Sequence, residues 1–178
     1  MRNSSNQTAS GVTTLQIAIC SIWLIFTIMA FAVLVDDQLV EFDGENKLTE
    51  ITPNALQQQL IGLVGSPVDT PENQVIHFQR NDCHCNRVTA THVQSLAKLA
   101  ESHGFSVNTV ELEDTETIVP SSPAVAIIES GKLLYFGPYG QGVSCSETSG
   151  FAQTVFENAQ KGYKDEIIMR QASGCYCA

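Results

Sequence analysis

The apolar and polar positions of this 178-residue chain separate one long uncharged segment from a mixed remainder. Residues 15–35 carry no charged side chain, and about 20 apolar residues are enough to cross a bilayer as a helix. The pattern predicts a single transmembrane helix over 15–35. A cleaved signal peptide is the alternative, because the segment begins near the N-terminus. The length of the segment and the single basic residue before it, Arg2, favour an uncleaved signal anchor.

The remainder alternates between helical and strand-like patterns. Leucines recur at helical spacing after Pro53, and later runs of apolar residues are short and bounded by turn residues. The predicted elements are a helix over 53–63, a strand over 74–79, a helix over 83–103, a strand over 105–112, a hairpin with strands 124–129 and 132–136, and a closing helix over 148–160. We therefore predict an α/β domain with a β-α-β-β-α core and an extra N-terminal helix.

These patterns also predict how the chain is divided. The predicted parts are a disordered N-terminus (1–14), the transmembrane anchor (15–35), an acidic linker (36–52), a folded domain (53–162) and a C-terminal tail (163–178). The tail ends with Cys175-Tyr176-Cys177 before Ala178.

Charge is distributed unevenly along the chain. All 19 acidic residues and eight of the nine basic residues follow residue 35, so this part is strongly acidic. An acidic surface repels nucleic acid, and we exclude nucleic acid as a partner. The positive-inside tendency places Arg2 and the N-terminus in the cytosol and residues 36–178 outside.

Five of the six cysteines, all except Cys20, follow the apolar segment. An oxidising compartment would permit disulfides among them, and their odd number leaves at least one cysteine free, paired between chains or bound to metal. Cys83 and Cys85 directly follow a predicted strand, at the start of a predicted helix. The unpaired amides and positive dipole of a helix N-terminus stabilise a thiolate, which is both the nucleophile and the metal ligand. This position predicts thiol chemistry.

This arrangement resembles the thioredoxin-like superfamily over about residues 53–162. The similarity lies in the cysteine pair after a strand, with Phe78 five residues before Cys83, in Pro123 before a second strand, and in a hairpin with a glycine-rich turn before the last helix. The resemblance implies a three-layer fold and a cis bond before Pro123, with the Ser122 backbone facing the cysteines. With its anchor and acidic outer domain, the chain looks like small bacterial envelope proteins of this type. This implies a single-pass protein of the inner membrane with a periplasmic C-terminal domain.

The resemblance also implies roles for individual residues. Cys83 matches the attacking cysteine, Cys85 the resolving cysteine that closes an intramolecular disulfide with it, and Pro123 shapes the substrate groove. The implied activity is that of a thiol-disulfide oxidoreductase or isomerase, which needs no cofactor and acts on protein thiols or disulfides of the envelope. The auxiliary residues are His84, Ser122, Cys145, Cys175 and Cys177. The chain departs from the usual Cys-x-x-Cys motif, because one residue rather than two separates Cys83 from Cys85.

Two other classes of function stay open. Cys83, Cys85, Cys175 and Cys177 form a candidate thiolate site for Zn or Cu, as in a metal-binding or copper-chaperone module of the same fold, with His84 as a further ligand. The tail cysteines fit three interpretations: exchange with Cys83 and Cys85, completion of this metal site, or an isolated tail that forms its own disulfide or none. The third class is a purely structural or interaction domain on an anchored stalk.

Overall fold

The computed structural model describes residues 13–36, 39–65, 72–113, 117–142 and 150–178. The chain forms two compact units, Met1–Asp37 and Gln38–Ala178. In the first unit, helix α1 (Thr14–Asp36) confirms the predicted apolar helix. Its segment Thr14–Val35 has a mean hydropathy of 2.6 and no buried residues. By length and composition α1 can cross a membrane, and a signal sequence near the N-terminus has the same properties.

The second unit is built around a five-stranded mixed sheet with the strand order β3-β2-β4-β5-β6. Its strands are β2 (Gln74–Gln79), β3 (Ser106–Glu111), β4 (Ala124–Glu129), β5 (Lys132–Pro138) and β6 (Ile167–Ile168). Strand β2 pairs parallel with β3 and antiparallel with β4, β4 pairs antiparallel with β5, and β5 pairs parallel with β6. The predicted strands 74–79, 105–112, 124–129 and 132–136 are confirmed within two residues at each end.

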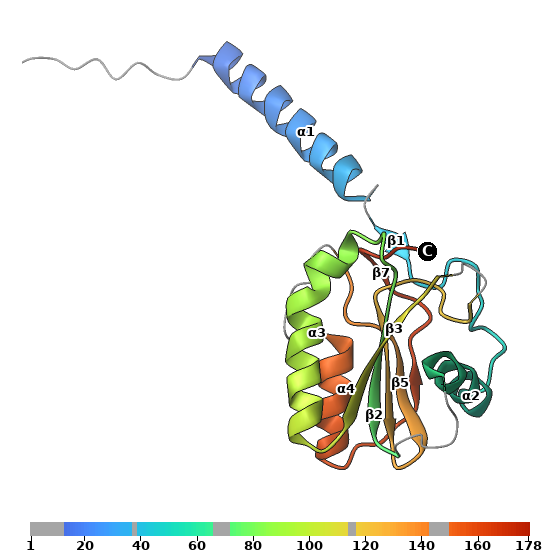
Figure 1. Cartoon of the computed structure of the whole chain (residues 1–178). Helices are drawn as coiled ribbons and strands as arrows, with labels where there is room; N and C mark the ends of the chain where they lie inside the picture. Colours follow the sequence, from blue (N-terminus) through green and yellow to red (C-terminus); the bar gives the residue numbers. More distant parts are fainter. Residues whose placement is uncertain (1–12, 37–38, 66–71, 114–116, 143–149) are drawn as a thin grey trace, which may run out of the picture. The chain divides into compact units, whose positions relative to one another are not determined.

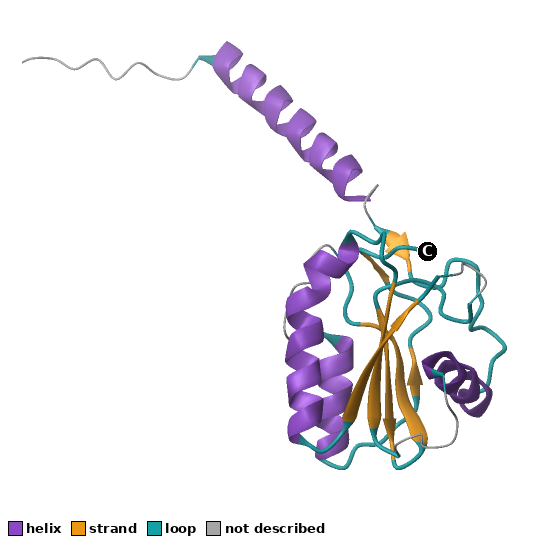
Figure 2. Cartoon of the chain, in the orientation of Figure 1, coloured by secondary structure: helices purple, strands orange, loops and turns teal. Residues whose placement is uncertain are grey.

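Helices cover both faces of the sheet (Figures 1 and 2). Helices α3 (Cys85–Ser102) and α4 (Phe151–Gln160) lie on one face, and α2 (Pro53–Val64) lies on the other. Two apolar clusters fill the spaces: Leu56 of α2 packs with Ile76, and Leu96 of α3 packs with Val75. Since successive strand residues point to opposite faces, a sheet buried on both sides needs continuous apolar strands. This is why β2 and β4 contain apolar runs.

The observed order corrects one prediction. Three strands, β3, β4 and β5, lie between α3 and α4, which is one more than in the predicted β-α-β-β-α core. These strands match the predicted ranges 105–112, 124–129 and 132–136, so the predicted formula was one strand short of the predicted elements themselves; β3 pairs with β2 along its whole length. Phe78, near the end of β2, pairs with Ala124 at the start of β4. The turn that carries Cys83 and the residues before Ala124 are therefore brought together.

The compact unit is wider than the predicted domain 53–162 and includes parts of the predicted linker and tail. Phe42 and Leu48, in the predicted linker, are fully buried, and Tyr176, in the tail, is 5% exposed. Strand β1 (Val40–Glu41) pairs antiparallel with β7 (Ser173–Gly174). These segments belong to the fold because their few apolar side chains complete the core cluster beneath α2.

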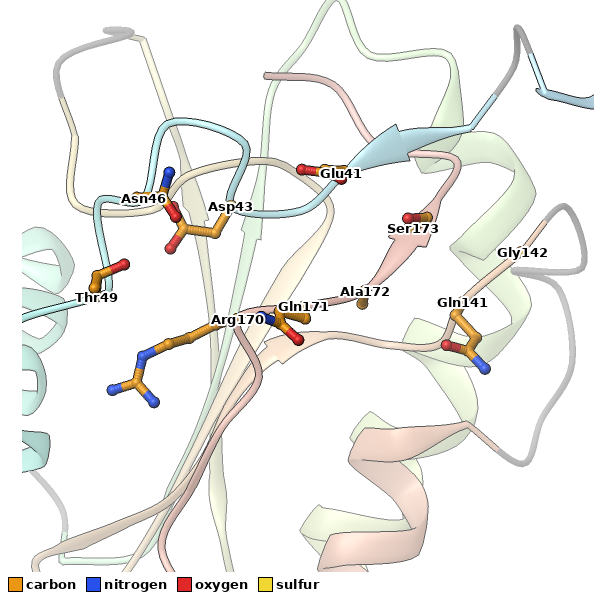
Figure 3. Close-up of a pocket in the computed structure, with 10 residues that line it drawn as sticks. All are labelled: Glu41, Asp43, Asn46, Thr49, Gln141, Gly142, Arg170, Gln171, Ala172 and Ser173. Atoms are coloured by element: carbon orange, nitrogen blue, oxygen red, sulfur yellow. The ribbon is translucent and has the colours of Figure 1, made fainter.

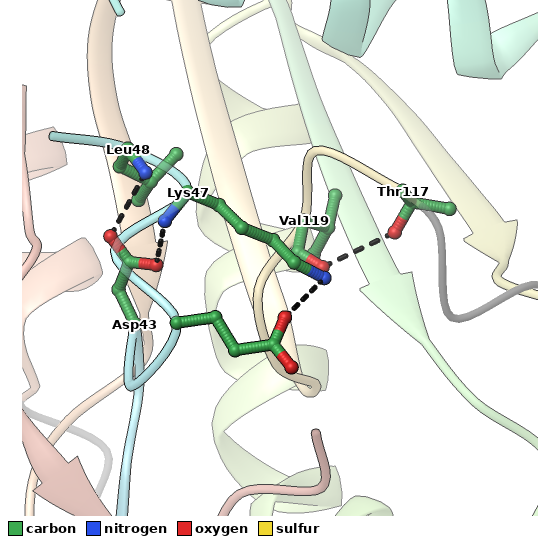
Figure 4. Close-up of polar contacts among 6 residues, drawn as sticks. Asp43, Lys47, Leu48, Thr117 and Val119 are labelled. Atoms are coloured by element: carbon green, nitrogen blue, oxygen red, sulfur yellow. Dashed lines mark hydrogen bonds and ion pairs between the residues drawn. The ribbon is translucent and has the colours of Figure 1, made fainter. Parts of the chain in front are cut away.

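A local hydrogen-bond network shapes the turn that follows β1 (Figure 4). The carboxylate of Asp43 accepts hydrogen bonds from the backbone amides of Lys47 (2.8 Å) and Leu48 (3.0 Å). These bonds satisfy amides that the turn leaves unpaired, as a short acidic side chain commonly does. The turn places Leu48 in the core. Strand β1, which precedes the turn, forms a two-stranded sheet with β7.

Candidate functional site

The cysteine pair lies in a tight turn between β2 and α3. The amide of Cys83 donates to the Arg80 carbonyl (3.2 Å), and the amide of Asn86 donates to the Cys83 carbonyl (3.2 Å). The side-chain amide of Asn86 closes the turn by donating to the Arg80 carbonyl (2.5 Å). Helix α3 begins at Cys85, two residues later than predicted, because this turn holds Cys83 outside the helix. Both cysteine side chains are buried.

Ser122 and Pro123 face this turn as expected. The peptide bond between them is cis, which confirms the expectation for Pro123. The Cys83 Sγ lies 3.6 Å from the carbonyl oxygen of Ser122. The structure therefore brings Cys83 together with Ser122, which lies 39 residues later in the sequence, and with the adjacent Pro123.

The C-terminal tail fills the space beside Ser122. The amide of Cys177 donates to the Ser122 carbonyl, and the amide of Ser122 donates to the Cys177 carbonyl, both at 2.8 Å. Ser122 and Cys177 thus form an antiparallel bridge of the kind that an added β-strand makes. The tail lies against the cis-proline segment as an extended peptide.

Two disulfides attach the tail to the cysteine pair. Cys83 bonds to Cys177 and Cys85 bonds to Cys175, with Cα–Cα distances of 5.8 Å and 5.6 Å, within the usual range for disulfides. The implied disulfide between Cys83 and Cys85 is therefore absent in this state. The physical reason is competition between partners. The tail places the Cys177 sulfur against Cys83 and the Cys175 sulfur against Cys85, so each cysteine of the turn bonds to the tail and not to the other cysteine of the turn.

Non-covalent contacts also fix the tail. The Tyr176 hydroxyl donates to the Gly140 carbonyl (2.5 Å), and its ring meets the Phe42 ring edge-on with centroids 5.6 Å apart. Further backbone bonds join Phe42 to Ala172 (2.8 Å) and Gly142 to Ser173 (2.7 Å). The tail is therefore part of the folded unit independently of its disulfides.

Gly174 is required for this packing. A β-carbon at this position would lie 2.7 Å from the Tyr176 ring and 3.2 Å from the Gly142 carbonyl oxygen. Contacts under 3.0 Å force atoms to move, so only glycine lets the tail backbone pass between these groups. The spacing Gly-Cys-Tyr-Cys therefore has a steric basis.

His84 lies beside the Cys85–Cys175 disulfide. Its Nε2 is 3.6 Å from the Cys85 Sγ and 3.7 Å from the Cys175 Sγ. The side chain is exposed and precedes the first residue of α3. The auxiliary role expected for His84 is thus consistent with its position, and the structure adds its proximity to a tail cysteine.

A buried histidine–tyrosine cluster lies nearby, and the sequence patterns do not reveal it. His77 on β2 hydrogen-bonds through Nδ1 to the Tyr139 hydroxyl, and His92 of α3 packs against the same ring with centroids 5.3 Å apart. Burial lowers the pKa of His77 to about 4 and also lowers the pKa of His92. Burial, with a smaller contribution from Tyr135, raises the pKa of Tyr139. Both histidines are therefore neutral near pH 7.

Two cavities flank the site. A cavity of about 210 Å³ is bounded by His77, Tyr139, Asn86 and Pro123, among other residues. A wider one of about 780 Å³ lies beside the tail, between the turn after β1 and residues 170–173 (Figure 3). In the wider cavity the Asp43 carboxylate accepts hydrogen bonds from two backbone amides, and the Nε of Arg170 donates to the Leu48 carbonyl (2.8 Å). None of the described residues that line this cavity is a cysteine.

Two cysteines, Cys20 and Cys145, take no part in the two disulfides. Cys145 lies outside the described residues, so its predicted auxiliary role stays a prediction. Cys20 is a free, exposed cysteine of α1 in the other unit. All four cysteines that the structure joins in disulfides were among the candidates.

Comparison with known proteins identifies the family. Residues 52–178 match a domain of unknown function, DUF6436. The chain belongs to this family. No curated protein and no solved structure matches the chain significantly. The matched DUF6436 region contains both the Cys83-His84-Cys85 turn and the Cys175-Tyr176-Cys177 tail, so the whole site lies within one family domain.

Proposed function

We propose that this chain is a membrane-anchored thiol-disulfide oxidoreductase of the thioredoxin-like type, with its tail cysteines as built-in exchange partners. One observation carries the proposal: Cys177 is disulfide-bonded to Cys83 while its backbone pairs antiparallel with Ser122 beside Pro123. An oxidoreductase that recognises extended peptides would hold a substrate in this way during a mixed disulfide. The tail occupies the position of such a substrate.

The fold supports the same proposal. The Cys83 turn follows β2 and leads into α3, and Pro123 precedes the neighbouring antiparallel strand β4. The β4–β5 hairpin is followed by α4, which lies on the same face of the sheet as α3 (Figure 1). These are the features on which the thioredoxin-like resemblance rests. The parallel β2–β3 pair joined through α3 provides the rigid support for the turn.

Exposure suggests where exchange with a partner begins. Cys83 and Cys85 are 6% and 1% exposed, whereas Cys175 and Cys177 are less deeply buried. A thiolate of a partner dithiol attacks the Cys175 sulfur, the Cys175–Cys85 bond breaks, and Cys85 leaves as a thiolate. The second thiol of the partner then displaces Cys175, which leaves the partner with a disulfide and Cys85 and Cys175 as thiols. The partner loses two electrons and two protons, and the disulfide gains them.

The released Cys85 thiolate is placed for a second exchange. Its sulfur lies within 4.8 Å of the sulfurs of both Cys83 and Cys177. Attack on the Cys83 sulfur forms a Cys83–Cys85 bond and releases Cys177, with no net change in electrons. The disulfide implied by the thioredoxin-like resemblance thus appears as an intermediate in this scheme, in which both tail cysteines are thiols and the remaining disulfide joins Cys83 to Cys85.

The location of the domain belongs to the same proposal. Two disulfides suit an oxidising compartment, and α1 is long enough to anchor the chain. We place the unit Gln38–Ala178 on the periplasmic side of a bacterial inner membrane, where its partners are protein thiols and disulfides.

The test uses the compact unit Gln38–Ala178 in its oxidised form. Incubation with an excess of a two-thiol peptide should convert peptide to its disulfide in step with the appearance of protein thiols, as mass spectrometry after alkylation would show. The Cys85→Ala/Cys175→Ala variant should oxidise the peptide much more slowly, and Cys145→Ser should oxidise it at the wild-type rate. Protein disulfides that persist in the folded state under excess dithiol would instead make the tail a structural staple.

A further inference from the structure

Reduction of both disulfides would leave an unusual concentration of ligands for a soft metal ion. Two groups of potential ligand atoms each lie within 4.8 Å of one another: the sulfurs of Cys83, Cys85 and Cys177, and the sulfurs of Cys85 and Cys175 with a nitrogen of His84. Cys85 belongs to both groups. The two sets therefore form two three-ligand sites that share one sulfur.

The non-covalent contacts of the tail keep these ligands together after reduction. The buried Tyr176 ring, its bond to the Gly140 carbonyl and the Ser122–Cys177 backbone pair do not involve a disulfide. The β1–β7 pair and the Phe42–Ala172 bond hold the segment that precedes the cysteines. The reduced chain therefore does not pay the full ordering entropy that an unfolded tail would cost on binding a metal.

We infer that the reduced protein binds Cu(I) through Cys83, Cys85, Cys175 and Cys177, with His84 as a nitrogen ligand, and that the two disulfides block this site. The inference goes beyond the proposed exchange activity, because it requires no turnover. Thiolates select soft ions such as Cu(I) and Zn. The geometry favours Cu(I), because structural zinc sites are four-coordinate and use Cys-x₂₋₄-Cys spacing, whereas this chain has two Cys-x-Cys pairs in three-ligand groups.

An external dithiol supplies the electrons and protons that convert the oxidised protein, with two disulfides, to the reduced protein. Each disulfide takes up two electrons and two protons from a reducing dithiol, which itself becomes a disulfide. Binding of Cu(I) then displaces the protons of the thiols that become ligands. Reoxidation of the cysteines by a disulfide reverses the sequence and releases the metal, so the site is gated by the redox state of the tail.

The test is a titration of the full chain, purified in detergent and kept anaerobic, against the coloured Cu(I)–bicinchoninate complex. One sample retains both disulfides, and the other is reduced with dithiothreitol and desalted. The reduced protein should withdraw Cu(I) in stoichiometric amount, and the oxidised protein should withdraw none. Cys175→Ser should weaken binding by the reduced protein, whereas Cys20→Ser should leave it unchanged.

His84 provides a variant that is expected to leave the fold intact, because its side chain is exposed and neither disulfide includes it. His84→Asn should lower the Cu(I) affinity of the reduced protein about tenfold or more. The matched control is His103→Asn, which changes a histidine at the other end of α3. Equal copper uptake by oxidised and reduced protein, or wild-type affinity in His84→Asn, would overturn the inference. Retention of Zn(II) in preference to Cu(I) would overturn the assignment of the metal. Because this assay needs no thiol exchange, it can fail while the exchange assay succeeds.

Discussion

The two disulfides make a prediction about stability that follows from their arrangement. Cys83–Cys177 and Cys85–Cys175 close loops of nearly the same size, with sequence separations of 94 and 90 residues. A disulfide stabilises chiefly by restricting the unfolded chain, and a loop of this length is worth about 4.7 kcal/mol in the chain-entropy model. Once either bond is present, the other closes only a ring of roughly six residues, which is worth about 2 kcal/mol.

The expected costs are therefore strongly non-additive. Cys83→Ala/Cys177→Ala and Cys85→Ala/Cys175→Ala should each lower the free energy of unfolding by about 2 kcal/mol, apart from small packing losses. Removing both pairs should lower it by about 7 kcal/mol, because the large loop then opens as well.

The assay is urea unfolding of Gln38–Ala178 and its variants, with the free energies compared at a common denaturant concentration. The wild type, the two pair variants and the variant that lacks both pairs form a double-mutant cycle in which each step removes one disulfide. Removing one disulfide should therefore lower the free energy of unfolding much less when the other disulfide is present than when it is absent. Costs that simply add, with the quadruple variant equal to the sum of the pairs, would refute the loop-closure reasoning.

Two further perturbations test the packing of the tail and the buried cluster. Gly174→Ala should destabilise the unit by about 1–3 kcal/mol, because its β-carbon would overlap the Tyr176 ring; the control Gly62→Ala, with open space around its β-carbon in α2, should be neutral or stabilising in the same urea assay. Lowering the pH from 6.5 to 4 should reduce the free energy of unfolding by about 3 kcal/mol, because burial lowers the pKa of His77 from 6.5 to about 4 and the unfolded chain therefore binds more protons in that range. Urea midpoints that do not change between pH 7 and pH 4 would contradict this assignment, and a Gly174→Ala chain as stable as Gly62→Ala would contradict the steric argument.

Local patterns were sufficient to predict most of the elements. Helix α2 follows from the leucine spacing after Pro53, and the structure adds a cap, because the Thr52 hydroxyl accepts from the Ala55 amide (3.3 Å). Strands β2 and β4 follow from continuous apolar runs, because both faces of the sheet are covered. These signals are carried by neighbouring residues and do not depend on the rest of the chain.

The features that the sequence patterns missed depend on distant partners. Phe42 and Leu48 are isolated apolar residues in a polar segment, and nothing local shows that Tyr176 and α2 bury them. The crossed disulfides were likewise unpredicted, since sequence spacing does not determine connectivity. His77 lies within an apolar strand, and only the fold brings it to Tyr139, 62 residues later.

The central claim is that the tail and the Cys83-His84-Cys85 turn exchange disulfides reversibly. The most direct measurement is a titration of Gln38–Ala178 in glutathione redox buffers, with alkylation and peptide mapping of the disulfides at each potential. We predict a reversible transition in which Cys85–Cys175 opens first and a Cys83–Cys85 disulfide appears before all four cysteines become thiols. Disulfides that open only when the chain unfolds, with no Cys83–Cys85 species at any potential, would contradict the claim.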